Sequence, residues 1–438
     1  MSLMAAPHLA GRHYAVLGLA RSGLATLGFL ARSGARALAW DERAEARDAA
    51  RDLPAVTLAD PMETPLDGLD GLILSPGVPL NRHPIAARAM AAGCPILGDM
   101  DLFQEARPYL PPHRVVGITG TNGKSTTTAL LHHLLAHAGR PALLGGNIGR
   151  PILGEAPLPE GGTYVLELSS FQIDLCHHLA VDIAILTNIT PDHLDRYAGL
   201  EAYAAAKARL FALQGDGATA IVAVDDRLTV SIAAALPPRL QLIRVSREDV
   251  DPSDQARWPA LAGPHNAQNA ACAMAAARAL GLGAADIASG LASYPGLPHR
   301  MEIVALRGGV RFVNDSKATN PDSAAPALGA YQGIHWIAGG QAKADDLEAC
   351  RPWFPHVRAA YLVGEAAPLF QRLLSPDLPV VMAGTIETAV ERAAAAAGPG
   401  ETVLLSPACA SFDQFRDFEA RGEAFRAAVR ALGEVASC

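Results

Sequence analysis

The sequence is poor in charged and aromatic residues and carries no dense cysteine pattern. Only 18% of its 438 residues are charged and 5% are aromatic, whereas half are hydrophobic. This composition is typical of an ordered globular protein. The wide cysteine spacing, without a CxxC pair, argues against a disulfide scaffold or a zinc knuckle and favours a reducing compartment. The six cysteines are Cys94, Cys176, Cys272, Cys350, Cys409 and Cys438.

The chain also lacks a leader pattern, a long apolar run and an excess of positive charge. No basic cluster precedes a long apolar stretch at the amino terminus, so no signal peptide is predicted. The most apolar helix-like run, residues 270–277, ends at Arg278 and is far shorter than the roughly 20 residues of a membrane span. A net charge of -8 argues against general nucleic-acid binding. We therefore expect a cytoplasmic protein with neither a nucleic-acid nor a membrane partner.

Short apolar runs alternate with glycine turns and alanine-rich segments of helical spacing, which predicts an α/β fold. Because most of these runs are continuously apolar, we expect mostly parallel sheets covered on both faces. Proline-rich joints at residues 107–114 and 294–300 divide the chain into three domains, residues 1–106, 107–297 and 298–438. The predicted strands cover residues 14–17, 72–74, 115–119, 164–168, 183–186, 311–313, 334–338, 360–363 and 403–405.

The strongest motif is VVGITGTNGKSTTTALLHHLL, a β-branched strand followed by a glycine-rich turn and an apolar helix. Glycines 117, 120 and 123 let backbone N–H groups surround an anion, and Lys124 can reach terminal phosphates. Ser125 or Thr126 would hold Mg²⁺. The usual GxxxxGK[ST] pattern requires glycine at position 118, where this chain has Ile118. The alternative is a turn that merely connects strand to helix, but the flanking strand and helix favour nucleotide binding.

Polar side chains follow other predicted strands of the central domain. In open parallel sheets ligands bind beyond the carboxyl ends of the strands, so these residues should face the same nucleotide. A carboxylate and an imidazole there are suitable Mg²⁺ ligands. Taken alone, Glu167 would be a helix cap or surface carboxylate and His193 an ordinary turn histidine. The segments supply Asn147; Glu167, Ser169, Ser170 and Gln172; and Asn188, Asp192, His193 and Asp195.

Together, these motifs and several others resemble the Mur ligase family. The others are YAAAKARLF, GPHNAQNAACA, LPHRME, NDSKATNP and SPACASFDQF, which occur in the family's order and extend the resemblance over essentially the whole chain. The resemblance implies a Rossmann-like amino-terminal domain for UDP-sugar, a central phosphate-loop ATPase and a Rossmann-like carboxyl-terminal domain for the amino acid. It further implies addition of D-glutamate to UDP-N-acetylmuramoyl-L-alanine through an acyl phosphate, in peptidoglycan precursor synthesis.

The resemblance also implies a nucleotide and metal site with ATP and two Mg²⁺ ions. Lys207 would be carbamylated by CO₂ and ligate the second ion, although as plain sequence it is a lysine on an alanine-rich helix. The catalytic residues would be Lys124, His193, Lys207, Asp315 and Lys317. The metal ligands would be Ser125, Glu167, His193 and Lys207. ATP would contact Gly120, Thr121, Asn122, Gly123, Lys124, Ser125, Thr126, Asn266, Asn269, Arg300, Asp315 and Lys317.

The two remaining substrates would bind the outer domains. A dicarboxylate requires a cation and hydroxyl or backbone donors, which suits the residues implied for D-glutamate. The AWDER segment has Glu42 between Asp41 and Arg43, where the family has threonine. D-Glutamate would contact Thr319, Lys343, Ser411 and Phe418. The UDP-sugar would contact Leu19, Ala20, Arg21, Ser22, Asp41, Arg43, Ser75, Gly77 and Asn81, and the central domain would add Asn147, Ser169 and Gln172.

Three competing functions follow from parts of the same sequence. A ligase of the same superfamily could add L-alanine, a diamino acid or, in folate metabolism, glutamate chains. A nucleotide switch or transport ATPase could use the phosphate loop, but it would need no NDSKATN and SPACAS segments. A nicotinamide dehydrogenase could use GLARSG, although this GxAxxG turn lacks the middle glycine of dinucleotide fingerprints. We expect the D-glutamate ligase, acting as a monomer.

Overall fold

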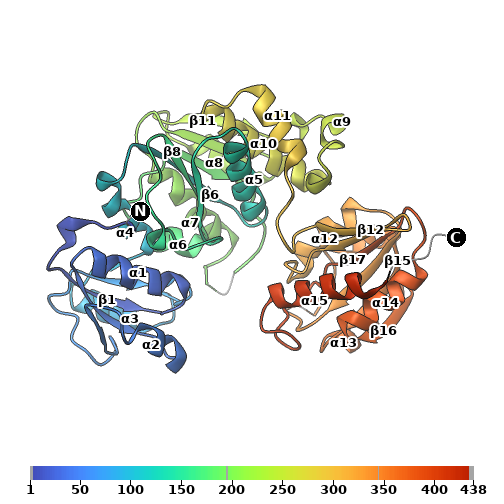
Figure 1. Ribbon diagram of the computed structural model, residues 1–438, viewed down its shortest axis with the longest axis horizontal. Coiled ribbons are helices and arrows are strands. Elements are labelled where there is room, and N and C mark those ends of the chain that lie inside the picture. Colours follow the sequence, from blue (N-terminus) through green and yellow to red (C-terminus); the bar gives the residue numbers. More distant parts are fainter. Residues whose placement is uncertain (1–2, 194–195, 344, 434–438) are drawn as a thin grey trace. The chain divides into compact units, whose positions relative to one another are not determined.

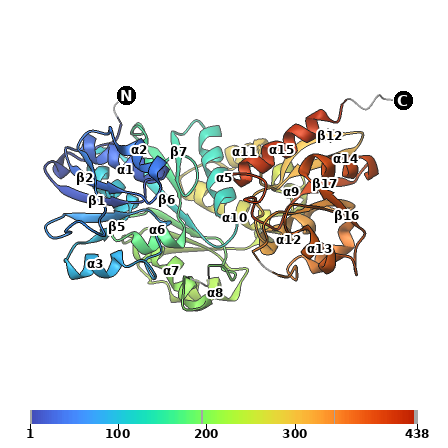
Figure 2. The ribbon, with the colours of Figure 1, turned by 90° about the horizontal axis from the view of Figure 1, so that it is seen from below.

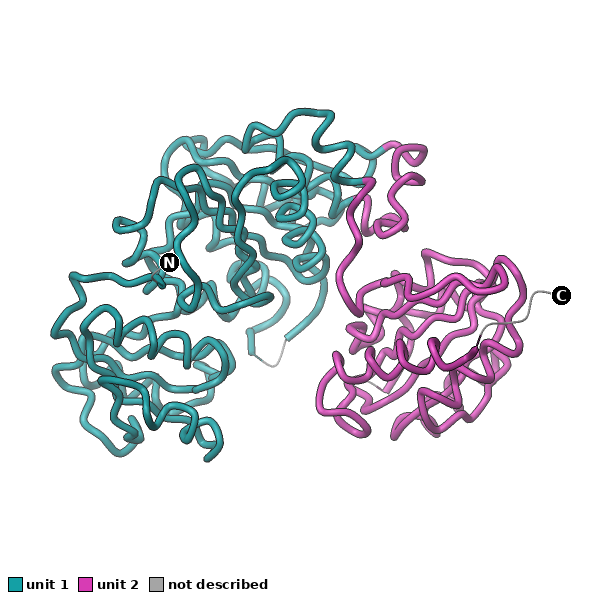
Figure 3. Tube along the Cα trace, in the orientation of Figure 1, with its two compact units in different colours: residues 1–250, 268–291 teal, residues 251–267, 292–438 magenta. Residues whose placement is uncertain are grey.

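The computed structural model describes residues 3–193, 196–343 and 345–433 (Figure 1). The chain forms two compact units, one of Met1–Val250 with Gln268–Leu291 and the other of Asp251–Ala267 with Ala292–Cys438 (Figure 3). The first unit contains two separate sheets and the second contains one.

The amino-terminal sheet has five parallel strands in the order β3-β2-β1-β4-β5. This order places the turn after β1 at the centre of the sheet, where a Rossmann-like fold binds its ligand. The strands are β1 (His13–Leu17), β2 (Arg36–Trp40), β3 (Val56–Leu58), β4 (Gly71–Leu74) and β5 (Ile96–Leu97). The helices are η1 (Pro7–Leu9), α1 (Arg21–Arg32), α2 (Ala44–Ala50), α3 (Ile85–Ala91), α4 (Asp99–Ala106) and η2 (Arg107–Tyr109).

The central sheet has six parallel strands in the order β11-β10-β9-β6-β8-β7. Its middle strands are buried almost throughout, as expected for parallel strands covered on both faces. The strands are β6 (His113–Thr119), β7 (Ala142–Gly146), β8 (Gly162–Glu167), β9 (Ile183–Leu186), β10 (Thr219–Ala223) and β11 (Gln241–Val245). The helices are α5 (Lys124–His137), η3 (Ile152–Gly154), α6 (Ser170–Leu175), α7 (Leu200–Ala212), α8 (Arg227–Ala235), η4 (Arg247–Asp249) and α11 (Ala284–Ser293).

Helix α10 (Pro264–Ala279) contributes to both units. Its alanines are mostly buried, which explains why an alanine-rich run of this length forms a helix inside the protein. The second unit also contains the short helices α9 (Pro252–Gln255) and η5 (Pro259–Leu261). Among the described residues, no helix is long and apolar enough to cross a membrane.

The carboxyl-terminal sheet has the strand order β12-β13-β17-β14-β15-β16, parallel except for the β12–β13 pair. Helices α12 and α13 cover one face of this sheet, and α14 and α15 cover the other (Figure 2). Trp336 and Leu404 belong to the core on the first face, and Ile337 and Val403 belong to the core on the second. The strands are β12 (Glu302–Arg307), β13 (Val310–Asn314), β14 (Ile334–Gly339), β15 (Val357–Val363), β16 (Val380–Gly384) and β17 (Thr402–Leu405). The helices are α12 (Pro321–Ala330), η6 (Arg351–His356), α13 (Ala367–Leu374), α14 (Ile386–Ala396) and α15 (Phe418–Ala431).

The predicted fold class is confirmed, because all three sheets are of α/β type and all but one strand pair are parallel. Each predicted strand overlaps an observed one. The sequence prediction omitted β2, β3, β5, β7, β10, β11, β12 and β16, of which several are half-buried or only two or three residues long. The domain boundaries after residues 106 and 297 stay predictions.

Candidate active site

The loop between β6 and α5 has a conformation that requires glycine at two positions. Gly120 has a φ of +147°, and a Cβ atom there would lie 1.9 Å from Thr187 Oγ1. Gly123 has a φ of +81°, and its Cβ would lie 2.1 Å from Asn269 Oδ1. No L side chain fits these positions without displacing a neighbour. The backbone is therefore drawn tightly round the start of α5, where N–H groups can meet an anion.

The segment that follows β9 holds this loop in place. The Thr121 N–H donates to the Asn188 carbonyl at 2.8 Å, and the Asn122 N–H donates to Asn188 Oδ1 at 2.8 Å. Thr187 Oγ1 donates to the Asn122 carbonyl at 2.7 Å. Asn188, which the sequence analysis placed beyond a strand end, thus fixes the loop conformation. Ser125 and Thr126 continue the loop into the first turn of α5, with Ser125 buried.

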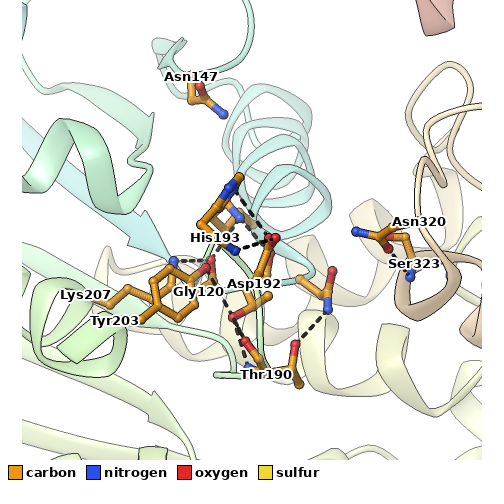
Figure 4. Close-up of polar contacts among 12 residues, drawn as sticks. Gly120, Asn147, Thr190, Asp192, His193, Tyr203, Lys207, Asn320 and Ser323 are labelled. Carbon is orange, nitrogen blue, oxygen red and sulfur yellow. Dashed lines mark hydrogen bonds and ion pairs between the residues drawn. The ribbon is translucent and has the colours of Figure 1, made fainter. Parts of the chain in front are cut away.

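Two lysines converge on the carbonyl of Gly120. Lys124 Nζ donates to it at 2.9 Å and to the Thr121 carbonyl at 2.7 Å, and Lys207 Nζ from α7 donates to it at 2.7 Å. The Lys207 ammonium also lies 4.3 Å from the centre of the Tyr203 ring (Figure 4). Two lysines, one from α5 and one from α7, therefore bond to the backbone of a loop whose N–H groups can meet an anion.

Lys207 is the most deeply buried of the predicted catalytic residues, with 1% of its surface exposed. Burial, together with the positive charge of Lys124, lowers its pKa to about 6, against the opposing effects of Asp192, Asp174 and Glu167. At neutral pH its amine is therefore mostly unprotonated. An unprotonated amine is a nucleophile, so this environment suits reaction with CO₂.

Glu167 ends β8 and is 1% exposed. Its Oε1 accepts a hydrogen bond from Asn147 Nδ2 at 2.8 Å, while Oε2 has no hydrogen-bond partner among the residues that the structure describes. A buried carboxylate oxygen without a donor is costly unless a cation meets it. The residues present thus fit a divalent cation with oxygen ligands at this place.

His193 lies on an exposed turn and has a φ of +52°. Its Nε2 lies 3.5 Å from Asp192 Oδ2 (Figure 4). The centre of its ring lies 4.9 Å from that of the Phe171 ring. Asp195 lies outside the described residues. No group of three His, Cys, Asp or Glu side chains in the described ranges is arranged around a metal. Mg²⁺ commonly keeps waters and substrate phosphates among its ligands, so one or two protein side chains suffice.

Ser169 and Gln172 form a capping box at the start of α6. Ser169 Oγ accepts from the Gln172 N–H at 3.2 Å, and Gln172 Oε1 accepts from the Ser169 N–H at 3.1 Å. Both residues were predicted to contact substrate, and in this structure both also stabilise a helix start. Gln172 in addition lines the cavity described next.

A cavity of about 230 Å³ joins the amino-terminal sheet to the central sheet within the first unit. It brings together seven residues that were predicted to contact substrate, from segments far apart in the sequence. It also includes Asp99, to which the sequence analysis gave no role. The predicted residues that line it are Ala20, Arg21, Ser22, Ser75, Gly77, Asn147 and Gln172, and the others are Pro76, Asp99, Gly146, Gly149 and Pro151.

Asp41 and its neighbours lie outside this cavity lining. Asp41 Oδ2 accepts from the Leu19 N–H at 2.7 Å, and Oδ1 accepts from Arg43 Nε at 3.1 Å. Burial raises the pKa of Asp41, but the hydrogen bonds from Arg43 and Leu19 outweigh it and lower the pKa overall. Asn81 Nδ2 donates to the Arg196 carbonyl at 3.3 Å. Arg196 also lies 3.7 Å from the centre of the Phe171 ring.

In the second unit, Asp315 follows β13 and is buried. It accepts hydrogen bonds from Ser406 Oγ at 2.8 Å and from the Met301 N–H at 3.2 Å. Burial raises its pKa to about 7, although these hydrogen bonds and the charge of Arg300 oppose the rise. The Lys317 ammonium lies 4.1 Å from the centre of the Phe418 ring. Asp315 and Lys317 both lie on the short loop between β13 and α12.

The residues predicted for D-glutamate follow neighbouring strands of this sheet. Thr319 follows β13, Lys343 follows β14 and Ser411 follows β17, so all three come after the carboxyl ends of strands that pair in parallel. Phe418 begins α15. Lys343 is exposed, whereas Ser411 is buried.

Arg421 of α15 ties two of these loops together, and the sequence analysis missed it. Its guanidinium donates to the carbonyls of Ser316 at 2.8 Å, Cys409 at 3.0 Å and Ala410 at 3.1 Å, and it is 1% exposed. An arginine among alanine and phenylalanine on an amphipathic helix gives no signal that it faces inward.

The two asparagines of α10 have different surroundings. Asn269 belongs to the first unit, where its Oδ1 lies 3.4 Å from Thr127 Oγ1 and beside Gly123. Asn266 belongs to the second unit and donates from Nδ2 to the Ala262 carbonyl at 2.9 Å. The structure thus brings Asn269 to the phosphate loop within one unit.

Three family domains match this chain in order. They are the Mur ligase MurD-like N-terminal domain over residues 12–98, the Mur ligase middle domain over residues 118–277, and the Mur ligase glutamate ligase domain over residues 299–409. Curated relatives match nearly the full length. The chain is 62% identical to the UDP-N-acetylmuramoylalanine–D-glutamate ligase of Sphingopyxis alaskensis, covering 97% of this chain and 98% of the relative. It is 58% identical to the same-named protein of Novosphingobium aromaticivorans, covering 97% and 96%.

Solved structures of other ligases share the fold at low sequence identity. A MurF ligase from Thermotoga maritima has a TM-score of 0.61 at 16% identity, covering 96% of each chain. The UDP-N-acetylmuramate-alanine ligase of the same organism has a TM-score of 0.57 at 17% identity, covering 96% of this chain and all of the other. With the three domain matches and the curated relatives, these findings show that the chain belongs to the Mur ligase family.

Proposed function

We propose that this protein catalyses the ATP-dependent addition of D-glutamate to UDP-N-acetylmuramoyl-L-alanine, an early step of peptidoglycan precursor synthesis. The observation that carries the proposal is the 62% identity, over 97% of the chain, to a relative named for this reaction. The phosphate loop, the buried Glu167 and the buried Lys207 supply the groups that such a reaction needs. We further propose that the enzyme acts as a monomer in the cytoplasm.

The reaction proceeds in two substitutions. A carboxylate oxygen of the alanyl group attacks the γ-phosphorus of ATP, the bond to ADP breaks, and an acyl phosphate forms. The amine of D-glutamate then attacks the acyl carbon, phosphate leaves, and the amine loses a proton. Both substitutions develop negative charge on oxygen, so positioned cations and backbone N–H groups accelerate them. Lys124 and the backbone of residues 120–126 would hold the ATP phosphates, and the tight glycine turn before α5 supports this role.

Two Mg²⁺ ions complete the proposed site. Bound Mg²⁺ would offset the negative charge that develops on the phosphate oxygens. Ser125 and Glu167 would hold one ion, and His193 and modified Lys207 the other. The unpartnered Oε2 of Glu167 supports this assignment, because a divalent cation would supply the missing partner.

Carbamylation of Lys207 is part of the proposal. The unprotonated Nζ attacks CO₂, an N–C bond forms, and one proton is released, which leaves an anionic carbamate with two oxygens. The lowered pKa of this buried amine supports the modification. The carbamate would also place two oxygen atoms, which suit Mg²⁺ as ligands, where the chain alone has an amine. Incubation with ¹³C-bicarbonate should give a carbamate ¹³C signal that is absent from Lys207→Met.

The other residues position substrates. Asn269, Asn266, Arg300, Asp315 and Lys317 would contact the nucleotide. The cavity around Ser22, Ser75 and Asn147 would receive the UDP-sugar, with Asp41 and Arg43 beside the uracil. Thr319, Lys343, Ser411 and Phe418 would surround D-glutamate.

The decisive experiment offers several amines to one enzyme. Protein, ATP, Mg²⁺ and UDP-N-acetylmuramoyl-L-alanine are incubated with D-glutamate, L-glutamate, L-lysine or diaminopimelate, and phosphate release is measured. We expect release with D-glutamate alone. Lys124→Ala should abolish turnover, whereas Arg36→Ala, which removes an exposed cation on β2, should not. Release with another amine, or near-normal activity of Lys124→Ala, would contradict the proposal.

A further inference from the structure

Asp99 is a buried carboxylate in the cavity between the two sheets, and the reaction described above gives it no role. It begins α4, is 9% exposed and lines the cavity together with Ser22, Ser75 and Asn147. Its carboxylate meets the backbone N–H groups of Met100 and of Asp99 itself, and no side chain of the described residues donates a hydrogen bond to it. Burial raises its pKa to about 6. The buried Asp99 carboxylate can therefore accept further hydrogen bonds from a ligand.

The neighbouring carboxylate shows what a structural role looks like in the same segment. Asp101 Oδ1 accepts from the N–H groups of His177 at 2.8 Å and His178 at 2.9 Å, and Oδ2 accepts from the Gly98 N–H at 3.2 Å. Both carboxylate oxygens of Asp101 thus accept backbone hydrogen bonds, two of which join α4 to the loop after α6. Asp99 makes no comparable bond across the fold, and it faces a cavity instead of the core.

The lining of the cavity indicates which part of a ligand lies beside Asp99. It includes the turn after β1, with Arg21 and Ser22, which under the proposed function receives the diphosphate. It also includes Asn147, the hydrogen-bond partner of Glu167. The substrate portion between a diphosphate and the reacting carboxylate is the N-acetylmuramoyl sugar with its lactoyl-alanyl arm. A carboxylate repels phosphates but accepts from hydroxyl and amide N–H groups.

We propose that Asp99 binds the sugar part of the substrate, accepting a hydrogen bond from a hydroxyl or amide N–H of the N-acetylmuramoyl-alanyl group. The inference rests on the proposed function, because it takes the substrate from it. Arg21, the other charged residue of the cavity lining, serves the diphosphate end. Asp99 therefore distinguishes a UDP-sugar from UDP alone.

The test compares the whole substrate with a fragment that lacks the sugar. Asp99→Asn removes the charge at nearly constant shape, and Asp99→Ala removes the acceptor. Because charge-assisted hydrogen bonds are the stronger ones, we expect KM for UDP-N-acetylmuramoyl-L-alanine to rise about 3- to 10-fold in Asp99→Asn and about 10- to 100-fold in Asp99→Ala. The inhibition constant of UDP and KM for ATP and D-glutamate should stay within about two-fold.

Glu105→Gln is the matched control, because Glu105 lies on the same helix but pairs with His8 at the surface. It should leave every constant unchanged. An unchanged or lower KM for the UDP-sugar in both Asp99 variants would overturn the inference, and so would an equal loss of UDP binding, which would indicate a distorted diphosphate turn. Calorimetric titration of UDP-N-acetylmuramoyl-L-alanine into each variant reads the contact directly. If no amine supports phosphate release by the natural protein, the proposed function fails, and the titration still decides the role of Asp99.

Discussion

Replacing Lys207 with methionine should abolish ligation yet stabilise the folded protein at neutral pH. The side chain is 1% exposed, and burial lowers its pKa from the ordinary 10.5 to about 6. The unfolded lysine is protonated at pH 7 and the folded one is mostly not, so the unfolded chain binds more protons. Stability then rises with pH between about 6 and 10.5, and the penalty is greatest at low pH. Methionine carries no such penalty.

The size of the effect follows from the pKa difference. Each pH unit below the unfolded pKa is worth about 1.4 kcal/mol, which gives a penalty of at most about 5 kcal/mol at pH 7 and about 2 kcal/mol at pH 9. The variant loses the hydrogen bond to the Gly120 carbonyl and the packing of the amine against the Tyr203 ring, together about 2 kcal/mol. We therefore expect Lys207→Met to be more stable by about 2 to 3 kcal/mol at pH 7 and equal to the natural protein near pH 9.

The assay is urea unfolding followed by circular dichroism at several pH values in CO₂-free buffer. Lys343→Met is the control, because Lys343 is exposed and its replacement should give no pH-dependent difference. Added bicarbonate should stabilise the natural protein and leave Lys207→Met unchanged, since only the lysine can form a carbamate. The reasoning is refuted if Lys207→Met is no more stable than the natural protein at pH 7, or if its advantage grows as the pH rises.

Two further substitutions probe the loop and the proposed metal ligand. Gly123→Ala places a Cβ 2.1 Å from Asn269 Oδ1 at a positive φ, so KM for ATP should rise at least ten-fold and the free energy of unfolding should fall by about 1 to 2 kcal/mol. Gly139→Ala is the control, because its φ is also positive but the space around it is open. It should lower the free energy of unfolding and leave KM for ATP unchanged. Glu167→Gln should lower kcat by about 100-fold or more without lowering the thermal unfolding midpoint, because it removes a buried charge whose Oε2 lacks a partner. A fall in both kcat and midpoint would instead indicate a structural role.

The phosphate loop could be predicted because its information is local. A strand, three glycines, a lysine and an apolar helix follow one another within residues 115–135, so the sequence alone indicates both geometry and chemistry. Glu167 and Asn147 could be placed by a general rule, since the carboxyl ends of parallel strands meet at one edge of a sheet. The rule predicts that the two side chains lie close together, and they are joined by a hydrogen bond of 2.8 Å from Asn147 Nδ2 to Glu167 Oε1.

The surroundings of Lys207, Asp99 and Arg421 could not be derived in the same way. Lys207 lies on the alanine-rich helix α7. The lysine is buried because this helix packs in the central part of the fold, and the sequence of the helix does not indicate that burial. Asp99 follows the two-residue strand β5, and its cavity is completed by residues from both sheets of the first unit. Arg421 meets carbonyls more than ten residues away along the chain. In each case the decisive contacts come from distant segments, which no local pattern records.

Buried groups of three kinds, considered in each unit by itself, favour ligand binding at the proposed positions. Glu167 buries an oxygen without a donor, Lys207 buries an amine that burial keeps unprotonated, and Asp99 and Asp315 bury carboxyls with raised pKa values. Each of these groups destabilises the fold, because no described neighbour fully replaces the water that it lost. A cation, CO₂, a hydroxyl or a nucleotide can supply what is missing at each. A ligand that pairs with one of these four groups removes the penalty of burying it, and this adds to the free energy of binding. Only a ligand of matching charge and hydrogen-bonding capacity gains in this way.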